Sequence, residues 1–193
     1  MTTIPVGRYP APVAPFSAKG DFMADAFAEL LRYFLDNGAK GLLIAGDNAE
    51  AWSLSLDEIA EMTRLAMAAA QGKPVYVSAW AITERETIER ARAAADAGAY
   101  GLCVKPPHYV HSWVDALTPA IVRRFEVVAK EAPLPMLIGA GGGIGIIPAA
   151  YYKAAFNMLG LLGGHLRELV PSLTPADEAG VRDLLVRYGA LDG

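Results

Sequence analysis

Apolar and polar positions along the chain follow two alternating patterns. Segment 22–37 places apolar side chains three and four residues apart, which predicts a helix with one buried face; segments 55–71 and 83–97 are predicted to be helices as well. Short apolar runs without this spacing lie at 41–45, 74–79 and 101–105. Such runs are typical of strands that are buried on both faces, so the alternation predicts a parallel β/α fold.

One sequence pattern occurs twice, at 37–46 and at 97–106, and each copy follows a predicted helix. In both copies a glycine after the helix supplies a left-handed cap, and a short buried strand follows. Each strand stops at residues that could line a site, 47–50 in the first copy and 107–109 in the second. Because the chemistry of β/α barrels takes place at the carboxyl ends of the strands, these two loops are the first candidates for a site.

Prolines and glycines mark both ends of this β/α region. The Pro-rich segment 9–16 is predicted to be a first strand, and 133–138 is predicted to be a fifth, after a helix at 112–130. Segment 139–145 then holds five glycines in seven residues. A phosphate-binding loop is one interpretation of these glycines, and a junction where a longer ancestor was shortened is another.

The predicted architecture is an incomplete (β/α)8 TIM barrel followed by a helical tail. Two tail helices are predicted at 149–159 and 175–188. We count about five β/α units, whereas a closed barrel needs eight. The predicted division of the chain is a partial barrel at 1–138, a Gly-rich junction at 139–147 and a C-terminal helical segment at 148–193.

Composition and charge narrow the classes of partner. The 193 residues are 53% hydrophobic, enough for a real core, and a net charge of −4 without a basic cluster argues against nucleic acid. No apolar run approaches the roughly 20 residues that span a membrane, and the N-terminus lacks the basic and apolar regions of a signal peptide. The single cysteine, Cys103, lies in an apolar run and is expected to be a buried, reduced thiol, so we expect a cytoplasmic protein.

A family resemblance rests on the order and spacing of several segments along most of the chain. They are 12–16 in the predicted first strand, 46–50 after the second, 107–109 after the fourth, 133–138 in the fifth, and a C-terminal pattern from 148 to 191. Together they resemble the dihydrodipicolinate synthase / N-acetylneuraminate lyase family. Segment 46–50 stands where that family has a Gly-Thr-Thr-Gly-Glu type motif, and 107–109 stands where it has Pro-Tyr-Tyr.

The resemblance implies an aldolase of class I type, which is a lyase that makes or breaks a carbon–carbon or carbon–oxygen bond. Such enzymes form a Schiff base between a lysine and a 2-oxo acid, commonly pyruvate, because the iminium stabilises an adjacent carbanion. The resemblance also implies a homo-oligomer, and no metal or cofactor is expected. It implies a catalytic tyrosine at Tyr109 and substrate-binding residues at Gly46, Asp47, Asn48, Glu50 and His108. A carboxylate that braces its loop is the other interpretation of Glu50.

Three departures from the family pattern bear on activity. The part that would carry strands six to eight and the nucleophilic lysine is missing; Lys105 is the candidate substitute, and a lysine at the barrel rim is its other interpretation. Residues 139–140 replace the Tyr-Asn of strand five. Asp47 replaces a hydroxyl and, at about 4 Å and an intermediate dielectric, would repel a substrate carboxylate by about 4 kcal/mol, so we expect altered substrate choice. The alternative function is a non-catalytic remnant of the family or an oligomerising module with exposed sheet edges.

Overall fold

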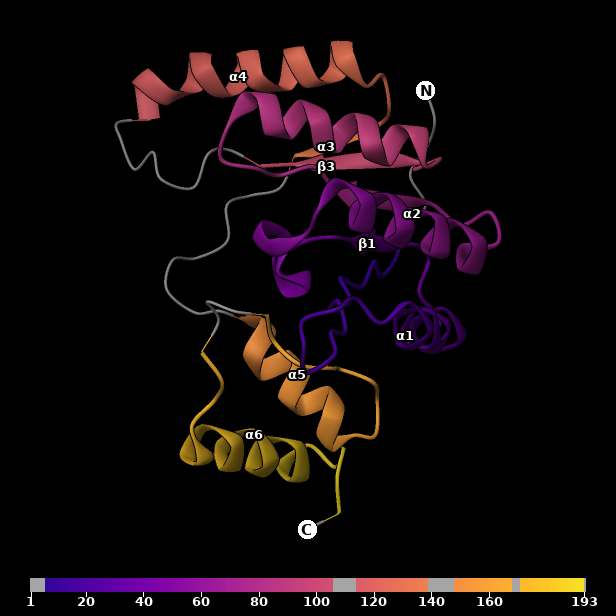
Figure 1. The fold of residues 1–193 in the computed structure, drawn as a ribbon, viewed down its shortest axis with the longest axis vertical. Helices are drawn as coiled ribbons and strands as arrows, with labels where there is room; N and C mark the ends of the chain where they lie inside the picture. The colour runs from indigo at the N-terminus through magenta and orange to yellow at the C-terminus, as the bar shows by residue number, and fades with distance from the viewer. Residues whose placement is uncertain (1–5, 106–113, 139–147, 168–170, 193) are drawn as a thin grey trace.

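The computed structural model describes residues 6–105, 114–138, 148–167 and 171–192. Helices and strands alternate through most of the chain, as the hydrophobic pattern predicts, and two helices follow at the C-terminus (Figure 1). The elements are α1 (Ala24–Asp36), β1 (Leu42–Ile44), η1 (Asp47–Ala49), η2 (Ala51–Ser53), α2 (Leu56–Ala70), β2 (Val75–Ser78), α3 (Glu84–Asp96), β3 (Gly101–Val104), α4 (Val114–Glu131), β4 (Met136–Ile138), α5 (Pro148–Met158) and α6 (Pro175–Arg187).

Three of the helices begin at capping boxes. At the start of α2, Ser55 Oγ accepts a hydrogen bond from the N–H of Glu58, and the Ser55 N–H donates to Glu58 Oε2 at 2.9 Å. The same reciprocal bonds occur at Thr83 for α3 and at Thr174 for α6. Each box satisfies backbone N–H groups that have no partner within the helix, which fixes where the helix begins.

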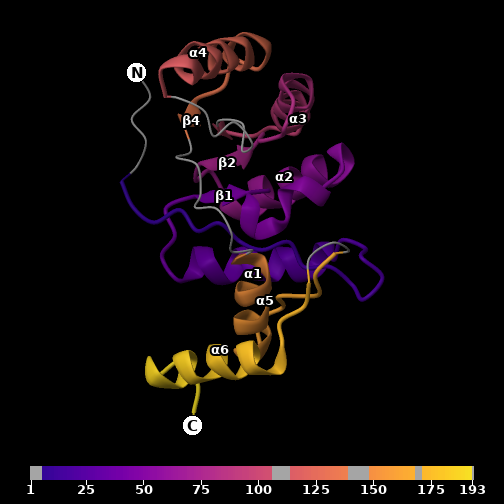
Figure 2. The same ribbon diagram turned by 90° about the vertical axis from the view of Figure 1, so that its left-hand side faces the viewer.

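The strands form a parallel sheet in the order β1-β2-β3-β4. Helices α2, α3 and α4 lie along one side of it, and the N-terminal segment runs beside β1 at the edge of the sheet (Figure 2). Ile44, Val77 and Val104 face these helices and are buried in the main hydrophobic core. Leu43, Ser78 and Cys103 alternate with them and therefore point to the opposite face. Cys103 is buried, as predicted.

The sequence repeat corresponds to a repeat in the structure. Gly38 and Gly98 end α1 and α3 with positive φ angles of 89° and 90°, and both helix ends have the hydrogen bonds of a Schellman motif. Gly41 and Gly101 then open β1 and β3 at places where a Cβ would lie within 2.6 Å of an aromatic ring, Tyr9 in one case and Tyr76 in the other. Glycine is therefore required by close packing at the start of both strands.

The predicted first strand at 9–16 is wrong. This segment is extended and lies beside β1, where Leu43 donates to the carbonyl of Pro10 at 3.0 Å and Lys40 donates to that of Arg8 at 2.9 Å. Prolines have no N–H with which to complete a ladder, and the segment holds three of them. The described part of the chain therefore has four strands where we predicted five.

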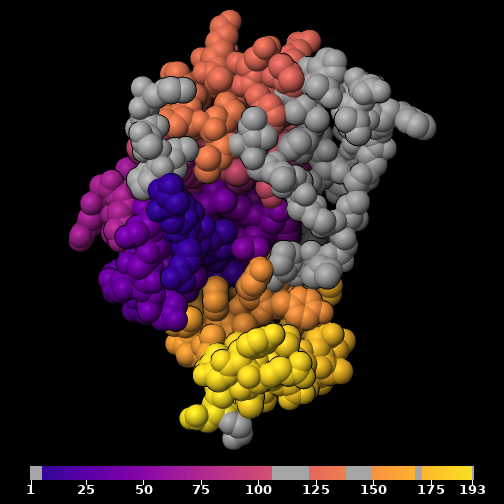
Figure 3. Space-filling view, turned by 180° about the vertical axis from the view of Figure 1, so that it is seen from behind, coloured from indigo at the N-terminus to yellow at the C-terminus, as the bar shows by residue number. Residues whose placement is uncertain are grey.

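The C-terminal helices lie beyond α1, at the end of the molecule opposite α4 (Figures 1 and 2). Helix α5 packs against η1 and against α6. Seen from behind, the N-terminal segment lies at the surface near the middle of the molecule, and the tail helices form its lower end (Figure 3). In the described residues, no helix is both long and apolar enough to cross a membrane.

Candidate functional site

Two predicted site residues, Asp47 and Lys105, meet at the carboxyl ends of the strands. Asp47 opens η1 after β1, Lys105 directly follows β3, and Lys105 Nζ donates to Asp47 Oδ2 at 2.5 Å. Because β2 lies between β1 and β3, this pair spans the carboxyl end of β2. The side chains are 14% and 24% exposed, so the pair is partly open to solvent.

Unsatisfied polar atoms lie at the same end of the sheet. Asp47 Oδ1 and the hydroxyl of Ser78, the last residue of β2, are buried without a hydrogen-bond partner in the described part of the structure. Buried polar atoms normally have partners, so these two are available to a ligand. The Lys105 ammonium lies beside the Asp47 carboxylate and would offset part of the repulsion that we expected between Asp47 and a substrate carboxylate, which stays a prediction.

Gly46 and Asn48 fix the backbone beside this pair. The carbonyl of Gly46 accepts hydrogen bonds from Ala49 at 2.9 Å and from Ala51 at 3.2 Å, which closes the turn after β1. Asn48 Nδ2 donates to the carbonyl of Ala11 at 3.1 Å and ties the turn to the N-terminal segment. The amide that we expected to bind substrate is therefore used, at least in part, to hold the loop.

Glu50 is fully buried, and its carboxylate contacts the C-terminal segment. Lys153 Nζ donates to its Oε1 at 2.5 Å, and the backbone N–H of Arg167 donates to its Oε2 at 3.0 Å. Both carboxylate oxygens are thus occupied by the C-terminal segment. This geometry does not support the substrate-binding role that the resemblance implied for Glu50 and favours its other interpretation, a carboxylate that braces the loop.

Lys153 is itself enclosed, with 2% of its side chain exposed. Its ammonium also donates to the carbonyl of His165 at 2.6 Å and lies 4.4 Å from the ring centre of Phe16. Burial lowers the pKa of Lys153 below its ordinary value; the hydrogen bond and charge of Glu50 oppose this shift, and the charge of Arg167 adds to it. Each of the two charges can stay buried because the other one compensates it.

Arg167 holds the far end of the same loop. Its guanidinium donates to the carbonyls of Ser53 at 2.6 Å and Gly20 at 3.0 Å, forms an ion pair with Glu58, and stacks 4.0 Å from the centre of the Phe16 ring. Burial alone would raise the pKa of Glu58, but the hydrogen bonds from Arg167 and Ser55 outweigh it and lower the pKa below 4.5.

Sequence analysis missed Lys153 and Arg167 as parts of the loop's surroundings. One signal was present, because Lys153 is the only charged residue in helix α5, which is otherwise apolar and aromatic except for Asn157. A lone charge of that kind is either on the solvent face or paired in the interior.

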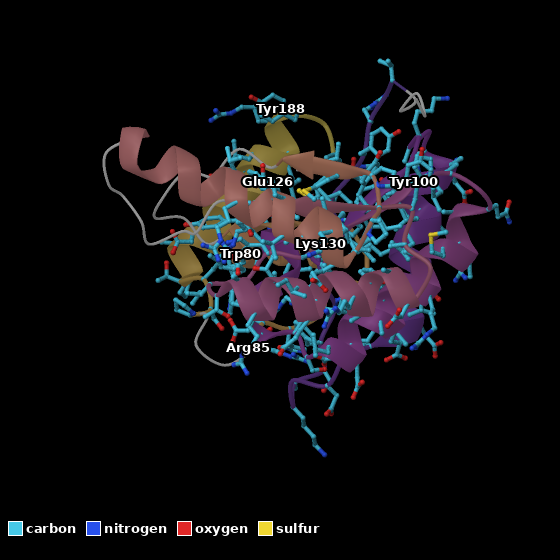
Figure 4. All side chains as sticks on the ribbon, turned by 90° about the horizontal axis from the view of Figure 1, so that it is seen from above. Trp80, Arg85, Tyr100, Glu126, Lys130 and Tyr188 are labelled. Carbon is cyan, nitrogen blue, oxygen red and sulfur yellow. The ribbon has the colours of Figure 1, made fainter. Side chains whose placement is uncertain are left out.

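The remaining predicted site residues, His108 and Tyr109, lie outside the described residues, as does the glycine run at 139–145. Trp80, just past β2, and Tyr100, just before β3, lie at opposite ends of the sheet (Figure 4). Trp80 thus marks the end at which Asp47 and Lys105 meet. A cavity of about 270 Å³ lies elsewhere, between α1 and α5, and no predicted site residue lines it.

A parallel β/α sheet with polar side chains at the carboxyl ends of its strands is the arrangement found in the class of β/α-barrel proteins. The chain belongs to the Dihydrodipicolinate synthetase family, whose model matches residues 5–139. This confirms the family resemblance and the partial-barrel fold.

Curated relatives carry several activities in their names. A probable 5-dehydro-4-deoxyglucarate dehydratase of Bacillus licheniformis is 35% identical over 161 residues, which is 73% of this chain and 52% of the relative. A probable mitochondrial 4-hydroxy-2-oxoglutarate aldolase of Emericella nidulans is 33% identical over 72% of this chain and 47% of its own length. The chain thus spans about half the length of these relatives.

A solved structure shows the same fold. The dihydrodipicolinate synthase of Aquifex aeolicus matches with a TM-score of 0.80 over 97% of this chain and 99% of its own, at 17% identity. The match includes the C-terminal part of this chain, so the tail helices belong to the shared fold.

Proposed function

We propose that this chain carries the 2-oxo-acid site of a lyase that acts on pyruvate or a related 2-oxo acid through a Schiff base on Lys105. The observation that carries the proposal is the contact of 2.5 Å between Lys105 Nζ and Asp47 Oδ2 at the carboxyl ends of β1 and β3. Family membership supports the reaction class, because the relatives are named as a dehydratase, an aldolase and synthases.

The proposed chemistry needs a neutral amine on Lys105. Asp47 Oδ2 is close enough to accept the proton that the ammonium must lose. The amine then adds to the ketone carbon of the 2-oxo acid, and loss of water leaves a carbon–nitrogen double bond. Once protonated, this iminium draws electrons from the neighbouring carbon, so that a bond to that carbon can break or form. The unsatisfied Ser78 hydroxyl lies at the same strand end, where it can donate a hydrogen bond to the substrate.

A second candidate is binding without catalysis. The same ion pair favours it, since an ammonium that stays protonated beside a carboxylate is a poor nucleophile. A homo-oligomer in which several chains complete one another's barrels fits either candidate.

Borohydride trapping separates the two candidates. We expect pyruvate and borohydride to add one reduced adduct to the wild-type chain, located by peptide mapping on Lys105. Lys105→Arg keeps the positive charge beside Asp47 but cannot form the iminium, so it should stay unlabelled. Lys130→Arg, a change at an exposed lysine of α4, should label like wild type.

Three results would contradict catalysis through Lys105. They are a folded wild-type chain that takes up no adduct while a complete family member does, an adduct on another lysine, and equal labelling of Lys105→Arg. Pyruvate binding without an adduct, measured by calorimetry, would support the second candidate.

A further inference from the structure

The loop that carries Asp47 and Asn48 has a conformation that its own sequence does not favour. It consists of two short 3₁₀ turns, η1 and η2, joined at Glu50. Glu50 has φ 55° and ψ 48°, a left-handed conformation that side chains other than glycine rarely adopt. Such a backbone persists only where its surroundings hold it, so the loop needs an external support.

The C-terminal segment supplies that support from 103 and 117 positions further along the chain. Lys153 Nζ and the Arg167 N–H take one Glu50 carboxylate oxygen each, and the Arg167 guanidinium binds the carbonyl of Ser53 at the other end of the loop. Lys153 is fixed in turn by the carbonyl of His165 and the ring of Phe16. The loop is thus attached to the C-terminal segment through the buried side chains of Glu50 and Lys153.

Movement of Glu50 reaches the ligand-facing residues through the backbone. The Glu50 N–H donates to the carbonyl of Asp47 at 3.0 Å, and the Asp47 side chain holds Lys105. A shift of Glu50 therefore changes the distance between Asp47 and Lys105, which the proposed site requires to be short.

We propose that Lys153 and Arg167 are positioning residues, which set the geometry of the Asp47–Lys105 site through the buried carboxylate of Glu50 and the carbonyl of Ser53. Neither touches the proposed substrate. The C-terminal helical segment is then part of the binding machinery, and its docking adjusts the affinity of a site formed by other elements. The predicted effect on pyruvate binding rests on the proposed function, whereas the predicted effect on the stability of the loop does not.

The variant that tests it best is the double change Glu50→Gln with Lys153→Met. Lys153→Met alone would leave a buried carboxylate without its cation, which can prevent folding. The double change removes both charges together, and the glutamine oxygen can still accept from Arg167. Lys130→Met, at an exposed lysine of α4, is the matched control.

Hydrogen exchange of the amides at 46–54 is the ligand-independent readout. In the double variant we expect these amides to exchange about tenfold faster or more, with α3 unchanged, because the loop opens without global unfolding. We expect the pyruvate concentration for half-maximal trapping to rise about tenfold while the yield at saturation is kept, which separates positioning from loss of the nucleophile. The control should match wild type in both measurements.

Wild-type exchange and wild-type half-saturation in a folded double variant would overturn the proposal. If that variant does not fold, Arg167→Met decides, because it releases the loop at Ser53 and leaves the Glu50–Lys153 pair in place; unchanged protection of 46–54 in it would also overturn the proposal. If wild type traps no 2-oxo acid, the proposed function fails, and the exchange experiment still decides whether these residues hold the loop.

Discussion

The contribution of a charged residue to the stability of this protein depends on how far its ion pair is buried. The Glu50–Lys153 pair is enclosed, whereas the Glu58–Arg167 pair keeps 19% and 16% of its side chains exposed. Breaking an enclosed pair leaves a charge without solvent or partner, but a pair at the edge can take up water in its place. The two pairs therefore respond differently to pH and to substitution.

Glu58 gives the protein an acid-sensitive contribution to stability. Its pKa in the folded state lies below the ordinary value of 4.5, so folding favours the ionised form. The resulting stabilisation is fully present above about pH 4.5 and is lost as the pH falls through the lower, folded-state pKa. Between about pH 6 and about pH 3.5, we expect the free energy of unfolding to fall less in Glu58→Gln than in wild type. Urea denaturation at each pH measures this difference.

Glu126→Gln, at an exposed glutamate of α4, is the matched control and should keep the wild-type dependence on pH. An identical slope for Glu58→Gln and wild type would show that the contact with Arg167 contributes no ionisation-linked stability.

At the residue scale, the sequence predicts the candidate site only in part. Asp47 and Lys105 could be singled out because each directly follows a buried apolar run, and strand ends meet in a parallel sheet. Their direct contact, and the burial of Glu50 under Lys153, depend on the packing of segments far apart in sequence. Local pattern carries no information about such contacts.

Among the elements, the connection after α5 is tightly constrained by its packing against the backbone of Phe16. Gly164 has a φ of 70°, and a Cβ there would lie 2.6 Å from the backbone nitrogen of Phe16. This close approach lets His165 donate to the carbonyl of Phe16 and lets its own carbonyl reach Lys153.

Gly164→Ala should therefore destabilise the protein by about 2 kcal/mol or more, since it adds both backbone strain and a clash with main-chain atoms. Gly180→Ala is the matched substitution in the exposed part of α6, where a Cβ meets no atom within 4 Å. There we expect a stabilisation of about 0.5–1 kcal/mol, because alanine favours the helix. Thermal or urea unfolding of both variants measures the difference, and equal stabilities would contradict the role assigned to Gly164.

Helix positions were predictable to within one or two residues, whereas one strand was not. Capping boxes and glycine caps are local signals, and α2, α3 and α6 begin at the serine and threonine residues that carry them. Segment 9–16 has the extended backbone that its prolines impose, but a strand also requires donors at regular intervals. Counting extended segments therefore overestimates the number of paired strands.

For the whole molecule, the open sheet bears on whether the chain associates with other copies of itself. In the described residues β4 has a strand neighbour on one side only, which leaves backbone N–H and C=O groups along its other edge. Leu137 of β4 lies on the face of the sheet opposite the helices. Edges and apolar faces of this kind favour pairing with a second chain.

We expect the chain to self-associate, with a sedimentation coefficient that rises between about 1 and about 100 µM. Leu137→Lys should weaken this association, because a charge on that face opposes its burial in a partner. Leu184→Lys, at an exposed leucine of α6, is the control and should associate like wild type. A single monomeric species over the whole range, or equal effects of the two lysines, would contradict association through the sheet.

The distance in sequence between Glu50 and Lys153 also determines when their contact forms during folding. The β/α units are built from neighbours and can form early, but this ion pair must close a loop of about a hundred residues, which makes it a slow contact. Until this ion pair forms, both charges remain hydrated, and no contact stabilises the left-handed backbone conformation of Glu50. The site would therefore be the last part of the molecule to mature, assembled only when the end of the chain returns to a loop near its beginning.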